Sequence, residues 1–359
     1  MLYLDCNYLI IYMKKISLII LALLSVYTLG AQDLGKFEPK DDAFKSKKLT
    51  EGNKKLYIAS FNINFEIYKE AVDSKEAGGF GRSVKNAAKA KAAVGLSTLD
   101  KEAIQAKADQ LYQDFVDKMK AKGYELISAD EAGNTETYQG FEKAEGPNVF
   151  ETEMTGILSV VPTGYSYYYK DRNALSSKLA GLDKTPQNLS QELGDALVAD
   201  VSLVYVFSEV GNNWNMGRNQ AKVKLSIDYR LANLYNVTDE NTSAGLTSLV
   251  DKNKQAVALN SYVTFTRGKL KIGGSAESQY TGFMKSDLQI SGVLEEEEIV
   301  AYSTQTQATA TLQNPIVSIR GDNYSETTKW LEPDGQKYAE GIYLAGSEFI
   351  NYHLEEVFE

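Results

Sequence analysis

Cysteine and histidine are almost absent from this sequence. The 359 residues include one cysteine, Cys6, and one histidine, His353. Cys6 lies in an amino-terminal segment that we expect to be removed, so the mature chain would have no disulfide, cysteine-ligated metal or cysteine nucleophile. With a single histidine, Ser-His-Asp triads and histidine-rich metal sites are nearly excluded as well.

An excess of positive charge is also missing. Lys and Arg number 38 against 48 Asp and Glu, which gives a formal net charge of −10. Binding to nucleic acid requires clustered cations, so we expect no nucleic-acid partner. A hydrophobic content of 43% over 359 residues is enough for one large packed domain or two of ordinary size.

The amino terminus resembles an export signal. Lys14 and Lys15 precede an apolar stretch at residues 16–29, and small residues follow at Gly30 and Ala31. This pattern predicts a signal peptide cleaved near residue 31, with residues 1–12 as an upstream extension and Met13 as the better start; an uncleaved anchor is the alternative. No cysteine follows the apolar stretch, so no lipid anchor is expected. We expect a bacterial envelope protein, periplasmic, outer-membrane associated or extracellular.

The first part of the mature chain predicts a strand, a helix and a strand. Residues 32–55 are polar and predict a flexible leader. Residues 56–68 alternate apolar and polar positions, which places Glu66 on a wet face. Residues 85–93 are rich in Ala and Lys and predict an exposed helix. Residues 100–122 carry an apolar stripe at helical spacing, with Asp100 or Thr98 as a cap, Gly123 as the stop and a short strand at 124–127.

The centre of the chain, residues 185–231, gives the clearest pattern. Thr185 and Pro186 start a helix whose apolar face includes Leu189, Leu193 and Leu197. A buried strand follows at 201–207. Residues 223–231 then alternate strictly, which is typical of an antiparallel strand with one wet face.

Further strands are predicted at 156–161, 256–272, 288–293 and 299–311, and a last helix begins at Asp334. We expect His353 to lie on the surface near the end of that helix, stabilised by the helix dipole. The fold class is therefore α/β (α+β): a mixed, largely antiparallel sheet with helices packed on it. Residues 56–359 form the domain, with 232–330 as a possible β-rich subdomain.

Three sequence motifs could indicate a bound nucleotide or metal ion, but each lacks the residue spacing that such a site requires. Gly79 and Gly81 resemble a dinucleotide loop, yet Val84 stands where a third small residue belongs, so no cofactor is expected. The acidic residues at 239, 240 and 251 lack the spacing of a calcium loop, and no metal is expected. Residues 295–298 are four glutamates, which predict a solvated turn or helix start.

A tyrosine cluster is the candidate ligand-binding site. Tyr165, Tyr167, Tyr168 and Tyr169 lie within five positions of one another. Flat rings with hydroxyl groups can bind a carbohydrate or a peptide by stacking and hydrogen bonding. Tyrosines are also common as ordinary sheet residues, which is the alternative interpretation.

The order of elements resembles the periplasmic domain of the curli-secretion channel family (CsgG-like) and, more loosely, the amino-terminal domain of TolB. The matching positions are Leu193, Gly194, Ala199, Asp200 and Val201, followed by residues 225–231. The resemblance implies an α/β envelope domain that works through protein contacts. Channel members of that family carry a lipid-modified cysteine and membrane hairpins. This chain lacks the cysteine, and residues 262–272 alternate only partly, so we expect a family-like soluble domain without a pore.

Three hypotheses for function follow. The first is a non-enzymatic envelope protein that binds another envelope protein or itself, as a membrane-peripheral protein or a homo-oligomer. The second is a surface glycan or peptide binder that uses the tyrosine cluster. The third is a hydrolase with paired carboxylates, for which the 48 acidic residues provide no motif.

Overall fold

The computed structural model describes residues 32–75, 88–152, 156–169, 184–211, 220–238, 256–269, 276–304, 325 and 327–359. Met1–Asp33 is a separate unit from Leu34–Glu359, and the fold is that of the second unit. The expected signal peptide, the glycine motif near Gly79 and the acidic residues at 239, 240 and 251 lie outside the described residues. No helix in the described part is both long and apolar enough to span a membrane.

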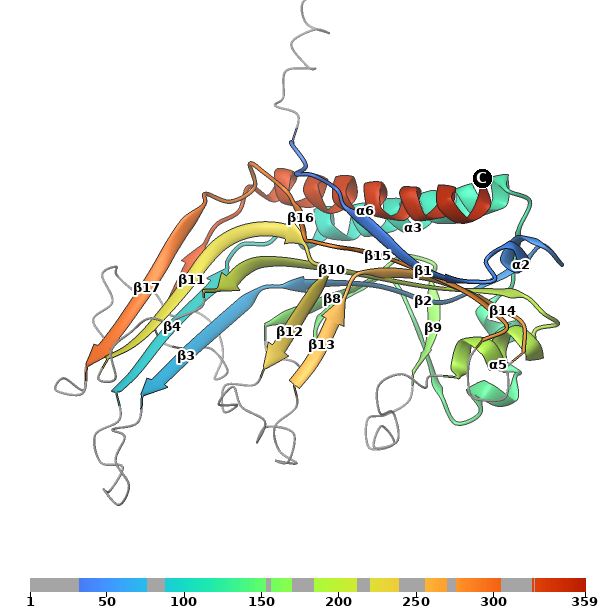
Figure 1. Cartoon of the computed structure of the whole chain (residues 1–359), viewed down its shortest axis with the longest axis horizontal. Helices are drawn as coiled ribbons and strands as arrows, with labels where there is room; N and C mark the ends of the chain where they lie inside the picture. Colours follow the sequence, from blue (N-terminus) through green and yellow to red (C-terminus); the bar gives the residue numbers. More distant parts are fainter. Residues whose placement is uncertain are drawn as a thin grey trace, which may run out of the picture. The chain divides into compact units, whose positions relative to one another are not determined.

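A mixed sheet of eleven strands forms the centre of the fold (Figure 1). Its main path runs in the order β1, β15, β14, β10, β2, β8, β7, and the remaining strands β11, β16, β17 and β5 pair at its sides. The path strands are β1 (Pro39–Phe44), β15 (Ser278–Met284), β14 (Tyr262–Arg267), β10 (Leu197–Val210), β2 (Lys55–Glu66), β8 (Ile157–Val161) and β7 (Asn148–Glu151). The side strands are β11 (Gln220–Leu231), β16 (Leu288–Gln289), β17 (Glu297–Thr304) and β5 (Glu125–Leu126).

The pairing in this sheet is mostly antiparallel, as the sequence predicts. Only β2 with β10 and β2 with β5 run parallel in it. Residues 223–231, in which apolar and polar positions alternate strictly, lie in β11, which is antiparallel to β10 and to β17. Residues 232–330 contribute β14 to β17 to the same sheet. Within residues 262–272, β14 is an interior strand between β10 and β15.

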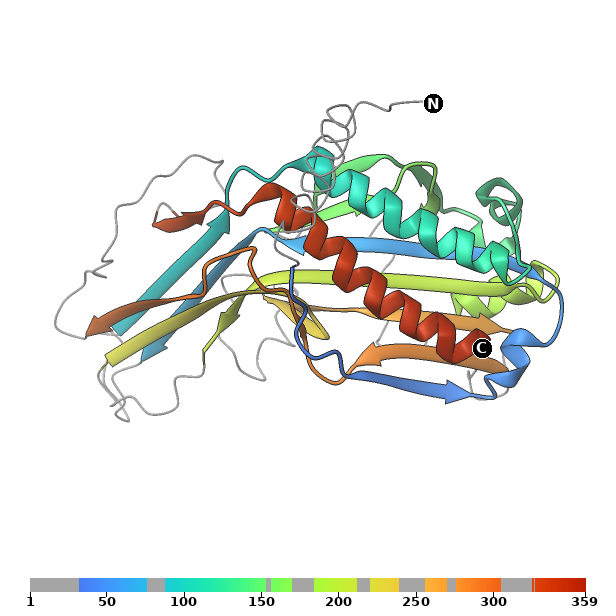
Figure 2. The same ribbon diagram turned by 90° about the horizontal axis from the view of Figure 1, so that it is seen from above.

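Two long helices cover one face of the sheet. Helix α3 (Lys101–Ala121) and helix α6 (Gly335–Phe358) lie side by side across the strands (Figure 2). The predicted stripe of α3 is buried, namely Ile104, Ala108, Leu111, Phe115 and Met119. Asp100 caps the helix by accepting a hydrogen bond from the Ala103 N–H at 2.9 Å. Gly123, at φ +87°, follows its end, so the predicted boundaries of this helix are confirmed.

A close approach of backbone to side chain seats α6 on the sheet. The hydroxyl of Tyr205 on β10 donates a hydrogen bond to the Ile342 carbonyl at 2.6 Å. A Cβ atom at Gly346 would lie 2.6 Å from the same hydroxyl oxygen. Glycine is therefore required here by space.

A second, smaller layer lies beside the helix-covered part. Strands β3 (Tyr68–Lys75), β4 (Ala88–Leu96) and β18 (Thr328–Leu331) form a three-stranded sheet, and β4 packs against β11 and β17 (Figure 1). The helix predicted at 85–93 is wrong for residues 88–93. Ala90 and Ala92 are buried while Lys91 is half-exposed, so the strand uses the period-two alternation of Ala and Lys, and packing overrides helix propensity.

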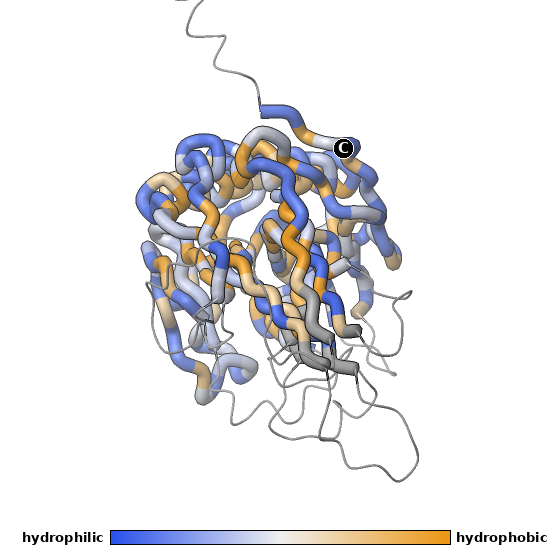
Figure 3. Tube along the Cα trace, turned by 90° about the vertical axis from the view of Figure 1, so that its left-hand side faces the viewer, coloured by the Kyte–Doolittle hydropathy of each residue, from blue (hydrophilic) through white to orange (hydrophobic). Residues whose placement is uncertain are grey.

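Two hairpin-like pairs and several short helices complete the fold. Strands β6 (Glu142–Glu145) and β9 (Ser166–Tyr169) pair with each other, as do β12 (Leu234–Thr238) and β13 (Ala256–Asn260). The short helices are α2 (Lys47–Thr50), α4 (Ala129–Gly133), the 3-10 turn η1 (Glu136–Tyr138) and α5 (Thr185–Glu192). Along the chain, hydrophobic positions gather on the inner strands and hydrophilic positions on the outer turns (Figure 3).

The helix at Thr185 begins as predicted and ends earlier. Gly194 and Asp195 have φ values of +73° and +65°, and the Asp195 N–H donates to the Ser190 carbonyl at 2.8 Å. This left-handed pair stops α5, and β10 begins at Leu197, which the sequence analysis had placed on the helix. The apolar spacing continued into the strand, so periodicity alone did not mark the boundary.

The polar leader is partly structured. Residues 39–44 form β1 on β15, and α2 follows directly. Leu34 forms a bridge with Ile290, and Phe37 contacts Phe349 and Tyr352 of α6 edge to face. This part of the expected leader therefore belongs to the fold.

Candidate functional site

The structure divides the four predicted tyrosines between two faces of β9. Tyr165 and Tyr167 stack at 6.0 Å between ring centroids, and Tyr169 continues the row at 6.0 Å. Tyr168 points to the other face, where its ring stacks on Tyr138 at 4.4 Å and its hydroxyl donates to the Ala129 carbonyl. This split follows from the period of two in a strand.

Only part of the tyrosine row is exposed to solvent. Tyr165 is 3% exposed, packs against Tyr112 and Phe61, and burial raises its pKa well above the usual range. Tyr169 is 43% exposed, and its hydroxyl donates to Glu142 Oε2 at 2.7 Å. The part of the predicted site that a ligand could reach therefore consists of the half-buried Tyr167 and the exposed Tyr169 and Glu142. Tyr165 is a core residue.

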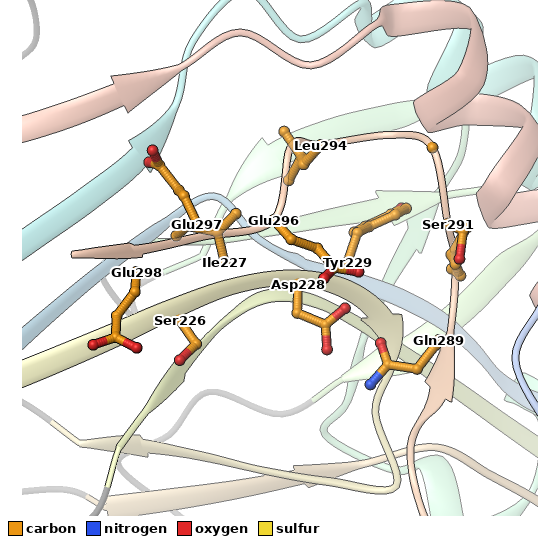
Figure 4. Close-up of a pocket in the computed structure, with 12 residues that line it drawn as sticks. Ser226, Ile227, Asp228, Tyr229, Gln289, Ser291, Leu294, Glu296, Glu297 and Glu298 are labelled. Carbon is orange, nitrogen blue, oxygen red and sulfur yellow. The ribbon is translucent and has the colours of Figure 1, made fainter.

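An acidic pocket lies at the outer edge of β11 (Figure 4). It has a volume of about 650 Å³ and occupies the gap between β16 and β17, which pair with different parts of β11. Asp228 and Glu296 line it, and burial is the main cause that raises the pKa of Asp228. Chemically, this pocket offers carboxylate and hydroxyl oxygens.

The four glutamates at 295–298 are more structured than predicted. Glu297 and Glu298 begin β17. Glu297 accepts two hydrogen bonds from Lys329, at 2.5 and 2.6 Å, and Glu298 pairs with Lys224. Among the described residues, no group of three or more acidic, His or Cys side chains is arranged to hold a metal ion.

A buried carboxylate at the end of β2 connects this strand to β10 and to β12. Glu66 is 1% exposed and accepts hydrogen bonds from the backbone N–H groups of Phe207 and Ser208, both at 2.9 Å. It also accepts from the Ser208 hydroxyl at 2.8 Å and from Tyr235 at 2.5 Å. The wet face predicted for Glu66 is therefore wrong, because the β12–β13 pair brings Tyr235 over this end of the strand.

The same network continues to β11. The register of β10 on β11 shifts between Val206 and Ser208, and this is the place where Glu66 accepts the freed amides. Arg230 donates to the Ser208 carbonyl at 3.0 Å and forms an ion pair with Asp287 at 2.8 Å. With these hydrogen bonds, Glu66 holds the irregular part of β10 in place.

The single histidine is also placed differently from its prediction. His353 is fully buried, and its Nδ1 lies 2.7 Å from the Tyr280 hydroxyl. Burial lowers its pKa to about 4, so the imidazole is neutral at physiological pH. The expected surface histidine at a helix end is wrong because α6 turns this position toward the sheet.

Together the fold and these sites define a mixed α/β protein with an open central sheet and a partly exposed aromatic row. Neither a search of protein-family models nor a search of curated proteins finds a match to this sequence.

Proposed function

We propose that the chain is an exported, non-catalytic protein of the bacterial envelope that acts by binding another envelope protein or by assembling with itself. The observation that supports it most is the open sheet. Strands β1 and β7 end the main path, and in the described part of the chain no further strand pairs with either. An outer strand presents unpaired N–H and C=O groups that a partner strand can complete.

Strand β1 is the better of the two candidate edges. Five of its six residues are exposed. Lys40, Asp41 and Asp42 place charges along it, which disfavours indiscriminate pairing and favours a partner with matching charges. This proposal carries forward the resemblance to a CsgG-like periplasmic domain, in which contacts between proteins perform the function.

A proline in β1 tests this proposal. The Lys285 N–H donates to the Glu38 carbonyl at 2.9 Å, so the alternation of an antiparallel ladder turns the amide of Ala43 outward. Ala43→Pro removes this outward donor and leaves the pairing with β15 intact. We expect crosslinking of the envelope fraction to yield a defined complex with the wild-type chain and none with the proline variant.

Ala43→Ser is the matched control, since it keeps the amide and should keep the complex. Circular dichroism verifies that all three chains are folded. A wild-type protein that remains a free monomer in the envelope fraction, or a complex that survives Ala43→Pro, argues against assembly through this edge.

The exposed tyrosines favour a second candidate function, a surface glycan or peptide binder. Tyr167 and Tyr169 place two rings next to each other, and the hydroxyl of Tyr169 lies beside the carboxylate of Glu142. A sugar ring can stack on such rings while its hydroxyl groups bond to the carboxylate. On a glycan array, Tyr169→Ala should abolish any signal of the wild-type protein without loss of fold, and Tyr352→Ala, an exposed tyrosine on α6, serves as the control. An unchanged signal in Tyr169→Ala rules out this site.

A further inference from the structure

A second pocket, of about 300 Å³, lies beside α2, the end of α5 and the end of β14. Its buried floor includes Arg267 and Ser278, and its exposed rim includes Lys48, Glu51 and Asp195. The volume is at the lower end of what small-molecule sites in proteins offer. None of these residues belongs to the acidic pocket on β11 or to the tyrosine row.

Arg267 is a buried cation whose donors are only partly used. The residue is 3% exposed, and its Nη2 donates to the Asn53 carbonyl at 3.0 Å. Its Nε and Nη1 have no hydrogen-bond partner among the described residues. The guanidinium lies beside Tyr124, where its positive charge and a hydrogen bond from it partly offset the burial that raises the pKa of that hydroxyl. Buried unmatched donors on a charged group are costly, so an acceptor supplied from outside would stabilise this arrangement.

The guanidinium of Arg267 packs closely against Gly52. Gly52 has φ +123°, and a Cβ there would lie 2.5 Å from Arg267 Nη1 and 3.8 Å from Asp195 Oδ2. The cation and the carboxylate thus both lie close to Gly52. Arg267 and Asp195 nevertheless form no ion pair in the described structure. Any side chain at Gly52 would collide with the guanidinium.

The remaining charges decide which ligand fits. Lys48 and Glu277 form an ion pair with each other at 2.9 Å. Within the described part of the chain, Asp195 and Glu51 form no ion pair, although Lys48 attracts both, so a positive floor faces a rim with an excess of negative charge. A simple anion would be repelled by the rim, and a simple cation by the floor.

We propose that this pocket binds a small zwitterion of the α-amino-acid class. Its carboxylate accepts hydrogen bonds from Arg267, which is the side chain best suited to carboxylate geometry. Its ammonium group lies toward Asp195 and Glu51 at the rim. The modest volume selects a small side chain. This site is independent of the edge strand and of the tyrosine row, so it adds a ligand to a protein that we otherwise propose to act through protein contacts.

The test is calorimetric titration of the purified mature chain with L-alanine, propionate and ethylammonium. Propionate is alanine without its amino group, and ethylammonium is alanine without its carboxylate. We expect saturable binding of L-alanine, and binding of either single-charge analogue that is weaker by about tenfold or more, since a hydrogen bond to a charged group contributes about 1.5 kcal/mol or more.

Three variants assign the binding to the pocket. Arg267→Gln and Asp195→Asn should each weaken alanine binding by about tenfold or more. Glu102→Gln, the same kind of change on exposed α3, should leave it unchanged. Asp195 lies on the exposed rim, so its variant remains informative if Arg267→Gln fails to fold. Absence of saturable alanine binding, equal binding of propionate, or full binding by Asp195→Asn overturns the proposal.

Discussion

At the scale of single residues, the buried polar groups make contacts that the sequence does not reveal. Glu66 lies in an alternating strand and was assigned to the wet face, but its partner Tyr235 is 169 positions away. His353 meets Tyr280 across 73 positions. The local sequence pattern predicts on which face of a strand or helix a residue lies. Whether a polar residue on that face is buried depends on which other elements pack against it.

The buried histidine predicts a pH dependence of stability. Its pKa is about 4 in the folded chain against 6.5 as the ordinary value, because burial disfavours the charged imidazole. The unfolded chain therefore binds the proton more readily. The stabilisation is fully present above pH 6.5 and is lost as the pH falls through 4, by about 3 kcal/mol in all.

Urea unfolding at neutral and mildly acidic pH measures this loss. His353→Gln keeps a polar side chain without a titrating ring, so its free energy of unfolding should fall less than that of the wild-type chain between the two pH values. Because both proteins contain the same carboxylates, the pH dependence that these groups contribute cancels in the comparison. Equal losses in the two proteins contradict a neutral, buried imidazole.

At the scale of elements, the sequence predicts a helix or strand correctly where the residues that determine it lie within the element itself. Helix α3 was predicted with its cap and stop, because Asp100, the apolar stripe and Gly123 all act within the helix itself. Strand β4 was missed, since Ala favours helices and the packing of β4 on β11 and β17 is not visible in the sequence. In the tyrosine cluster the alternation could have separated Tyr168 from its neighbours, but their unequal exposure depends on α3 and η1.

Helix α6 offers a prediction about its contact with the sheet. Alanine is ordinarily the better helix former, yet at Gly346 its Cβ would meet Tyr205, Leu111 and Leu203 at 2.6 to 3.1 Å. We expect Gly346→Ala to lower the free energy of unfolding by about 1 to 3 kcal/mol, the usual cost of overpacking.

A double-mutant cycle shows whether the hydroxyl causes this effect. Tyr205→Phe removes the oxygen nearest to the new methyl group, so Gly346→Ala should cost less in that background. If the two costs add, the strain arises from the leucines instead. If Gly346→Ala stabilises the chain, the described seating of α6 is wrong.

At the scale of the whole molecule, the first described segment contributes to the stability of the fold. Leu34 bridges to Ile290, and Phe37 packs against Phe349, Tyr352 and His353. A chain that begins at Lys45 loses these contacts together with β1. We expect its free energy of unfolding to be lower by about 3 kcal/mol or more, from the apolar surface that Leu34 and Phe37 leave exposed.

A chain that begins at Asp33 is the control for this truncation, because it retains both apolar residues and β1. Denaturant unfolding of the two chains, compared at equal protein concentration, gives the difference. Equal stability would restore the prediction of a leader that takes no part in the fold.

The parallel pairing at the centre of the sheet has a consequence for how the chain acquires its structure. Leu56 pairs with Leu197, so β2 must find a partner roughly 140 residues further along the chain. Such distant pairing makes the contact order high and the search slow. Until β10 arrives, β2 has, among the described strands, the short β5 and β8 beside it, and its apolar side chains are open to other chains. We therefore expect refolding in milliseconds to seconds rather than microseconds, with losses to aggregation that grow with protein concentration.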